Sequence, residues 1–295
     1  MGMQRIGFLG LGAMGSGMAG RLAAGGFAVS VHNRTRAKAE ALAGPGITVA
    51  ATPADAARDV DVLLVSLATA EVVEEFLFDA DGALAAATPG TIIADMSTVS
   101  PDTARAFAER IAAAGHRALD ACVLGNAQHA KDGELRFMIG GDAADVAELR
   151  PVFDVLAKEV VHLGEHGKGA TAKVAMTLLM GVQMQALAEA IVFGERAGLD
   201  RTQLIGMIAA SGYSSPVMKF KAGVMARRAF DHADFKLSLM RKDLLLALGD
   251  AQRLGVPMPA TTASYEVLTA AVNAGLGELD CAAILTEVER QAGTA

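Results

Sequence analysis

The stretch from residue 5 to residue 35 constrains the fold of this chain more than any other. It contains a short apolar run, the glycine pattern G-x-G-x-x-G at Gly10, Gly12 and Gly15, a helical segment, a glycine pair and a second apolar run. This order predicts a strand, a tight turn, a helix and a second strand. A glycine pattern alone is weak evidence, but its place between a predicted strand and a predicted helix indicates a dinucleotide-binding unit.

The three glycines have separate physical roles in such a unit. Gly10 permits the sharp turn out of the strand, Gly12 leaves room for a pyrophosphate, and Gly15 allows close packing of helix and strand. The phosphates would accept hydrogen bonds from free N–H groups at the helix N-terminus, where the helix dipole is positive. We therefore predict that these glycines, with Ala13 and Met14, bind the cofactor. The alternative is a plain tight turn.

The end of the second predicted strand selects between NAD and NADP. NAD sites usually carry Asp or Glu about 20 residues after the glycines, whereas an Arg accommodates the 2′-phosphate of NADP. This chain has Asn33, Arg34 and Thr35 there, so no carboxylate repels the phosphate and Arg34 supplies a forked donor. We predict that these three residues bind NADP and that NAD is the less favoured cofactor. The alternative is that Arg34 is a solvated loop charge.

Composition narrows the class of protein. With 295 residues, of which 52% are hydrophobic, the chain is long enough for one large or two ordinary domains. The formal net charge of −7 argues against a nucleic-acid partner, which would require a basic surface. Cys122 and Cys281 lack metal-ligand spacing and are expected to be reduced core thiols, so no metal site is expected.

Two features of the sequence bear on where in the cell the protein is expected to be. The chain enters a predicted strand almost at once, which leaves no room for a signal peptide. No apolar run reaches membrane-spanning length without glycine or charge. We expect a cytoplasmic protein that has a small-molecule substrate and no membrane partner.

Strands alternate with helices through the first half of the chain. The apolar runs 60–67 and 91–96 predict buried parallel strands, and 71–78 between them has a helical pattern. This alternation predicts a doubly wound α/β domain, the Rossmann architecture, in which ligands bind beyond the carboxyl ends of the strands. Leu67 and Ala68 follow the first of these runs. We predict that both contact the cofactor.

The segment after the second run, at residues 97–101, combines a helix start with free hydroxyl groups. Ser100 is expected to cap a helix that Pro101 opens. Ser97 and Thr98 precede the cap, where their hydroxyl groups either face the cofactor or have a structural role.

Two further strands are predicted at 117–122 and 137–139. They are joined by 123–136, a connection that contains Gly125, Asn126 and His129 and that we interpret as a long, functional loop. A lone loop histidine is more often exposed to solvent than catalytic.

From Gly164 onward the pattern becomes helical. A long helix is expected at about 169–197, roughly 40 Å in length at 1.5 Å per residue. Its methionines at 176, 180 and 184 share a face with Lys173 and Thr177 and are expected in the core or in a subunit contact. Lys173 differs, because a cation on an apolar face must reach solvent, a partner or a ligand. Shorter helices are predicted at 201–210, 217–226, 236–254, 259–273 and 282–291.

These features divide the chain into two predicted domains. We expect an NADP-binding Rossmann domain at 1–163, followed by an all-helical substrate and oligomerisation domain at 164–295 that begins with the long helix. The active site is expected in the cleft between them.

Five ordered motifs resemble the β-hydroxyacid dehydrogenase family over nearly the whole chain. They are G-F-L-G-L-G-A-M-G-S-G-M-A near the N-terminus, D-M-S-T-V-S-P at 95–101, D-A-C-V-L-G-N at 120–126, G-x-x-G-x-G-A-T-A-K ending at Lys173, and F-x-L-x-L-M-R-K-D-L at 235–244. The resemblance implies a Rossmann domain followed by a helical domain, homodimers or homotetramers built through the long helix, and small β-hydroxy acids or semialdehydes as substrates.

The resemblance also implies roles for individual residues. Lys173 matches the catalytic lysine, Thr98 a cofactor contact, and Lys242 a residue near the nicotinamide. Gly125 matches part of the substrate loop, so Leu124, Gly125 and Asn126 are candidate substrate-binding residues together with Lys173 and Thr177.

The substrate motif departs from the family pattern D-A-P-V-S-G-G. Cys122 replaces the proline, Leu124 the serine and Asn126 the second glycine, and Met176-Thr177 replaces the usual asparagine pair. Leu124 removes a hydroxyl donor for a carboxylate, which predicts a bulkier or less polar substrate than the small hydroxy acids. The alternative is that Leu124 turns into the core and that Gly125, Asn126 and Lys173 still bind a carboxylate.

The sequence thus predicts an NADP-dependent oxidoreductase that interconverts a hydroxy compound and its aldehyde or ketone, with Lys173 as general acid and base. One alternative is a reductase of imines or of carbonyl compounds without a carboxylate, on the same fold. The other is a non-catalytic protein that binds or senses NADP. NADPH oxidation across a panel of aldehydes discriminates between them, because a binding protein shows affinity without turnover.

Overall fold

The computed structural model describes residues 5–293, and the ends of the two predicted domains at 1–4 and 294–295 lie outside this range. The described chain divides into two compact units, one up to Lys173 and the other from Val174. This division falls within a long helix, α9, beyond the predicted boundary at 163/164. The two units are described separately below.

The first unit contains an eight-stranded sheet in the order β3-β2-β1-β4-β5-β6-β7-β8, as predicted for a doubly wound domain. Every neighbouring pair is parallel except β6 and β7, which run antiparallel. The order reverses between β1 and β4, which is where ligands bind in open α/β sheets. The strands are β1 Arg5–Leu9, β2 Ala28–His32, β3 Ile47–Val49, β4 Val62–Val65, β5 Ile92–Asp95, β6 Arg117–Leu124, β7 Leu135–Gly141 and β8 Ala157–His162.

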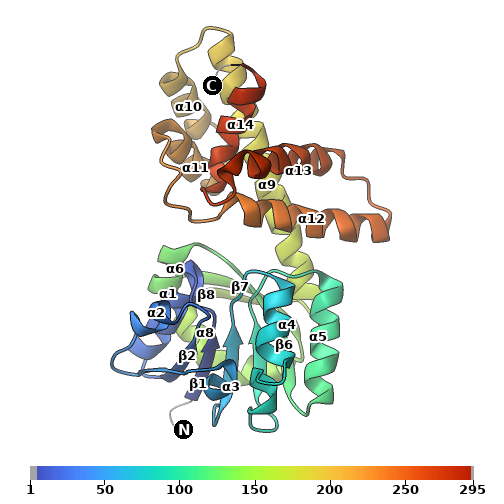
Figure 1. Cartoon of the computed structure of the whole chain (residues 1–295). Helices are drawn as coiled ribbons and strands as arrows, with labels where there is room; N and C mark the ends of the chain where they lie inside the picture. Colours follow the sequence, from blue (N-terminus) through green and yellow to red (C-terminus); the bar gives the residue numbers. More distant parts are fainter. Residues whose placement is uncertain (1–4, 294–295) are drawn as a thin grey trace. The chain divides into compact units, whose positions relative to one another are not determined.

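Helices cover both faces of this sheet (Figure 1). One face packs Phe8 of β1 against α1 and α8, and the other packs Leu63 of β4 against α4 and α5. Both strands are therefore buried on two sides, which explains their continuous apolar runs. The helices of this unit are α1 Ala13–Ala24, α2 Arg36–Glu40, α3 Pro53–Ala57, α4 Ala70–Phe78, the 3₁₀ turn η1 Ala83–Ala85, α5 Pro101–Ala113, α6 Ala127–Asp132, α7 Ala143–Glu148 and α8 Arg150–Leu156.

The sequence did not predict β3 and β8, which form the two edges of the sheet. β3 has three residues, and β8 reads A-K-E-V-V-H with much of its surface exposed. Edge strands are often short or charged and lack the apolar run that marks a central strand. The fold class was nevertheless recognisable, because the central strands carry the signal.

The predicted long loop at 123–136 is wrong. β6 continues to Leu124, and the short helix α6 occupies 127–132 before β7 begins at Leu135. Asn126 caps α6 by accepting a hydrogen bond from His129 N, and Gly133 ends it with a left-handed φ of 73°. Six helical residues with little apolar periodicity are too few to distinguish from a loop by pattern alone.

The second unit is helical, as predicted (Figure 1). Its core surrounds the buried face of α9, where Met184, Leu187 and Ile191 are almost fully covered. Met176, on the same predicted stripe, is 48% exposed. The helices are α9 Lys168–Arg196, which begins in the first unit, α10 Arg201–Ala210, α11 Pro216–Arg227, α12 Leu237–Leu254, α13 Pro259–Ala271, the π turn η2 Val272–Leu276, the 3₁₀ turn η3 Cys281–Ala283 and α14 Ile284–Gln291.

Among the described residues, α9 is the one helix long and apolar enough to cross a membrane, with a mean hydropathy of 1.5. Core helices of soluble proteins meet the same criterion. Met184 and Ile191 are buried in the core of the second unit, and this burial explains the apolar composition of α9.

Candidate functional site

The turn after β1 needs glycine at two positions for reasons internal to the protein. Gly10 has a left-handed φ of 95°, and a Cβ there would lie 2.2 Å from the carbonyl oxygen of Ser66. A Cβ at Gly15 would lie 2.0 Å from the carbonyl oxygen of Gly10. Both distances are far below van der Waals contact, so Gly10 and Gly15 allow β1, β4 and α1 to approach closely.

Gly12 is different, because a Cβ there would meet no protein atom within 4 Å. Gly12 is the N-cap of α1, and no side chain caps the free N–H groups that follow it. Ala13 is exposed beside it, and Met14 is half-buried. An uncapped helix N-terminus beneath open space is suited to a phosphate group. The residues of this turn therefore fit the pyrophosphate of a dinucleotide.

Asn33 holds the glycine turn in place. Its Oδ1 atom accepts a hydrogen bond from Leu11 N at 2.9 Å, and its Nδ2 atom donates to Thr35 O at 3.0 Å. Both polar atoms of the Asn33 side chain thus form hydrogen bonds within the protein. The neighbouring Arg34 is exposed.

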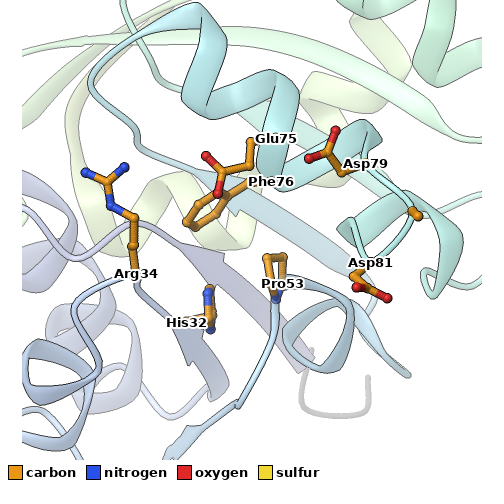
Figure 2. Close-up of a pocket in the computed structure, with 8 residues that line it drawn as sticks. His32, Arg34, Pro53, Glu75, Phe76, Asp79 and Asp81 are labelled. Atoms are coloured by element: carbon orange, nitrogen blue, oxygen red, sulfur yellow. The ribbon is translucent and has the colours of Figure 1, made fainter.

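Beside Arg34 lies an open pocket of about 600 Å³ (Figure 2). Arg34 stands at one end and Asp79 at the other, with the ring of Phe76 between them. His32 packs near Phe76, with ring centroids 5.5 Å apart. Burial lowers the pKa of His32, although a hydrogen bond with Ala50 O opposes the effect, so the imidazole is favoured in its neutral form. The pocket thus has a cation at one end and an uncharged aromatic floor, and the carboxylates of Glu75, Asp79 and Asp81 also line it.

The carboxyl ends of β4 and β5 are joined by side-chain hydrogen bonds. Leu67 N donates to Ser97 Oγ at 2.9 Å, and Ser97 N donates to Asp95 Oδ1 at 2.9 Å. The sequence left open whether Ser97 faces the cofactor or has a structural role, and these hydrogen bonds give it a structural role. Thr98 follows it and is half-buried, and Ala68 is exposed at the end of β4.

Ser100 caps α5, as predicted. Its Oγ atom accepts a hydrogen bond from Thr103 N at 3.0 Å, and Pro101 opens the helix.

Asp120 anchors the start of α9, a role that sequence reasoning missed. Its carboxylate, on β6, accepts hydrogen bonds from Gly167 N at 3.0 Å and Ala170 N at 2.9 Å, and its side chain is buried. A Cβ at Gly169 would lie 2.4 Å from Asp120 O, which explains a glycine of the G-x-x-G-x-G motif. A carboxylate in an apolar strand must find donors, and this was the signal in the sequence.

Lys173 lies on α9 beyond this anchor. Its Nζ atom donates a hydrogen bond to Val123 O at 2.9 Å, and its side chain is half-buried. Val123 directly precedes Leu124, Gly125 and Asn126. The structure thus brings the predicted catalytic lysine beside the predicted substrate loop within one unit.

The three residues of this loop have different environments. Leu124 is half-buried and packs against the core between the sheet and α4 and α5, which supports the alternative in which it turns inward. Gly125 has a φ of 145°, and a Cβ there would lie 2.7 Å from a methyl carbon of Leu135. Asn126 caps α6 with its side-chain oxygen. The oxygen of its side chain is therefore engaged by the helix.

The second unit contains the other two predicted site residues. Thr177 is buried on α9 and donates a hydrogen bond to Val174 O at 3.2 Å. Lys242 lies on α12, with its Nζ atom 3.1 Å from the carboxylate of the buried Asp243. In residues 5–293 no group of three His, Cys, Asp or Glu side chains is placed to hold a metal ion.

Two family models match the chain almost end to end. The NAD-binding domain of 6-phosphogluconate dehydrogenase matches residues 5–164, and the NAD-binding domain of NADP-dependent 3-hydroxyisobutyrate dehydrogenase matches residues 167–288. The first match contains the glycine turn and Arg34, and the second contains Lys173.

Individual proteins are similar to this chain over nearly the whole length of both. Glyoxylate/succinic semialdehyde reductase 1 of Arabidopsis thaliana is 34% identical over 96% of this chain and 98% of its own. The crystal structure of 3-hydroxyisobutyrate dehydrogenase from Salmonella typhimurium has a TM-score of 0.89 and 28% identity, covering 96% of this chain and 99% of that one. Psf3, solved with NADP⁺ and 2-OPP, has a TM-score of 0.86 and 28% identity, covering 96% and 99%. With the glycine turn and the lysine in place, the chain belongs to the β-hydroxyacid dehydrogenase family of nicotinamide-dependent oxidoreductases.

Proposed function

We propose that this protein is an NADP-dependent oxidoreductase that interconverts a hydroxy acid and its aldehyde or ketone. The observation that carries the proposal is the position of Lys173, whose ammonium is held by Val123 O beside the loop 124–126. The same unit contains the open, uncapped glycine turn. The cofactor supplies the hydride, and the protein orients the substrate and moves the proton.

Lys173 would act as the proton donor in reduction. Lysine side chains ordinarily carry their proton at neutral pH, so the reductive direction uses the ammonium in its usual form. The hydrogen bond to Val123 O directs one N–H of Nζ and holds the ammonium beside the loop 124–126. In oxidation the neutral amine would accept the proton from the hydroxyl group.

NADP is favoured over NAD by Arg34. The guanidinium is exposed at the end of β2, beside the pocket that His32 and Phe76 line. A guanidinium pairs with a phosphate through charge-assisted hydrogen bonds, and the ribose end of the cofactor would lie here. The relative Psf3 was solved with NADP⁺, which supports the same choice.

The substrate would carry a carboxylate. The partial packing of Leu124 against the core favours a carboxylate-binding loop over an apolar wall for a bulkier substrate. Gly125 is exposed in the loop that follows Val123, and the relative from Arabidopsis thaliana is named for glyoxylate and succinic semialdehyde. We therefore place small aldehyde acids first among the substrates to be tested.

Self-association would bury apolar side chains of the second unit. Phe193, Met207 and Tyr213 are more than two-thirds exposed, and Leu179 on α9 is about half exposed. Large apolar side chains exposed on the helices of one unit are candidates for a contact between subunits. We propose a homodimer or homotetramer formed through the second unit, and sedimentation equilibrium measures it. A monomer at micromolar concentration would contradict this proposal.

The function is tested by NADPH oxidation with glyoxylate, succinic semialdehyde, an uncharged aldehyde and a cyclic imine. We expect turnover with an aldehyde acid, and we expect Lys173→Ala to lower kcat by roughly 10²–10⁴ while NADP binding persists. Lys168→Ala is the matched control, because Lys168 is an exposed lysine at the start of the same helix. NADP binding without turnover on any compound would identify a binding protein instead, and turnover confined to the imine would identify an imine reductase.

A further inference from the structure

His129 and Asn126 hold each other through reciprocal hydrogen bonds at the start of α6. Asn126 Oδ1 accepts from His129 N at 3.0 Å, and His129 Nδ1 accepts from Asn126 N at 3.2 Å. A backbone N–H can only donate, so Nδ1 of His129 carries no proton in this arrangement. The proton of the neutral imidazole is therefore on Nε2.

Histidine gives this capping box a property that the usual residues lack. Glu or Gln normally occupies the third helical position, and each offers an oxygen acceptor to the N-cap amide. A protonated histidine has a hydrogen on both ring nitrogens and cannot accept. The bond from Asn126 N consequently exists only while His129 is neutral.

This bond fixes the loop that lies beside Lys173. Val123 O accepts from Lys173 Nζ, and Leu124, Gly125 and Asn126 follow directly in the chain. His129 also packs against the loop, because a Cβ at Gly125 would lie 3.2 Å from His129 Cβ. Through Asn126 N, His129 thus sets the position of the backbone between Lys173 and α6.

Several charged groups near α6 have partners of their own. On α1, the element that packs against α6, Arg21 donates to Val155 O. On α6 itself, Asp132 accepts from Gln128, and on β7 Arg136 pairs with Glu159. The remaining charged residues of this region are Lys131 and Glu134. This part of the chain thus carries charges of both signs, and His129 itself is exposed.

We propose that His129 is a pH-sensitive positioning residue for substrate binding. In its neutral form it anchors the loop 124–126 beside Lys173, and on protonation it releases Asn126 N and loosens the loop. Histidine is the residue type whose charge ordinarily changes between about pH 5 and 8. The inference rests on the proposed function, because it takes the loop as part of the substrate site.

The test is a set of pH profiles for KM and kcat from pH 5.5 to 8.5, with NADPH and succinic semialdehyde as the probe. Loss of one neutral hydrogen bond corresponds to a factor of about 2–10, so KM of the wild type should rise by that factor as the pH falls. His129→Gln keeps an acceptor at every pH and should retain the low KM throughout. His129→Ala should show the high KM throughout, with kcat changed less than KM in each case.

Gln128→Ala is the matched control, because Gln128 is an exposed neighbour on α6 that bonds to Asp132. It should retain the pH profile of the wild type. Identical KM profiles for the wild type and His129→Gln would overturn the proposal, since groups other than His129 would then cause the pH dependence.

Hydrogen exchange measured by mass spectrometry provides a readout without turnover. After correction for intrinsic exchange, a peptide that spans 124–134 should exchange faster at pH 5.5 than at pH 8 in the wild type, but not in His129→Gln. Equal protection in both proteins at both pH values would refute the role of His129. If no aldehyde is turned over, the proposed function fails. The exchange data would still test whether His129 anchors the loop through Asn126 N.

Discussion

Arg34 stands where an acidic side chain would select NAD. It is exposed at the end of β2, while the neighbouring Asn33 is occupied in holding the glycine turn. Removing the guanidinium should therefore affect the 2′-phosphate and little else. Arg36, two residues further on, pairs with Glu40 on the surface and offers a matched cation without that role.

We expect Arg34→Ala to weaken NADP binding by about 1.5–3 kcal/mol, the contribution of a charge-assisted hydrogen bond. NAD binding should change little, and Arg36→Ala should leave both affinities unchanged. Isothermal titration with each cofactor measures the difference. If Arg34→Ala weakened NAD as much as NADP, or if the parent protein preferred NAD, the assignment of Arg34 would be wrong.

At the scale of elements, a buried carboxylate on β6 holds the start of α9 within the first unit. Asp120 satisfies the N–H groups of Gly167 and Ala170, which a helix start leaves without intrahelical partners. Lys173 lies within the first turns of the same helix, so the position of its ammonium depends on this anchor. Asp142 caps α7 in a similar way by accepting from Ala144 N at 2.7 Å, but it is exposed.

Asp120→Asn keeps the shape but loses the charge and one of the two acceptors. We expect the free energy of unfolding to fall by about 1–2 kcal/mol, as for a lost helix cap, and kcat to fall as well. Asp142→Asn should cost less stability and leave kcat unchanged. Urea unfolding and steady-state kinetics measure both quantities. An Asp120→Asn protein with normal kcat would show that the anchor does not position Lys173.

At the scale of the whole molecule, we expect a buried carboxylate in the second unit to contribute to acid stability. Burial alone would raise the pKa of Glu289, but hydrogen bonds from Arg228 and Arg201 outweigh it and hold the pKa below its ordinary value. A carboxyl whose pKa is lowered by folding contributes stability above its ordinary pKa of about 4.3. This contribution is lost as the pH falls through the lower value of the folded state.

We expect Glu289→Gln to lower the free energy of unfolding by about 1–3 kcal/mol at pH 7, the usual contribution of hydrogen bonds to a charged group. The difference from the wild type should shrink as the pH falls from 5 to 3. Glu278 is 80% exposed and pairs with Lys236, so Glu278→Gln should have little effect at either pH. Urea unfolding followed by circular dichroism measures these differences. A gap between wild type and Glu289→Gln that stayed constant with pH would contradict the role of the charge.

The sequence by itself determined the fold class, the family and the parts of the site that depend on local pattern. The glycine turn was recognisable because the pattern at Gly10, Gly12 and Gly15 stands between a strand and a helix. The central strands were recognisable because burial on both faces requires continuous apolar runs. Ser100 and Pro101 mark the start of α5 through the chemistry of a single helix turn.

The tertiary structure alone decided how distant residues meet. Lys173 and Val123 are separated by 50 residues, as are Asp120 and Ala170, and no local pattern encodes such a pair. The direction of Leu124, which decides between core and substrate contact, depends on what β6 packs against. His129 appeared to be a lone loop histidine until α6 placed its Nδ1 atom against Asn126 N. Periodicity records which residues are buried, whereas partners across the fold are determined only when the strands and helices pack.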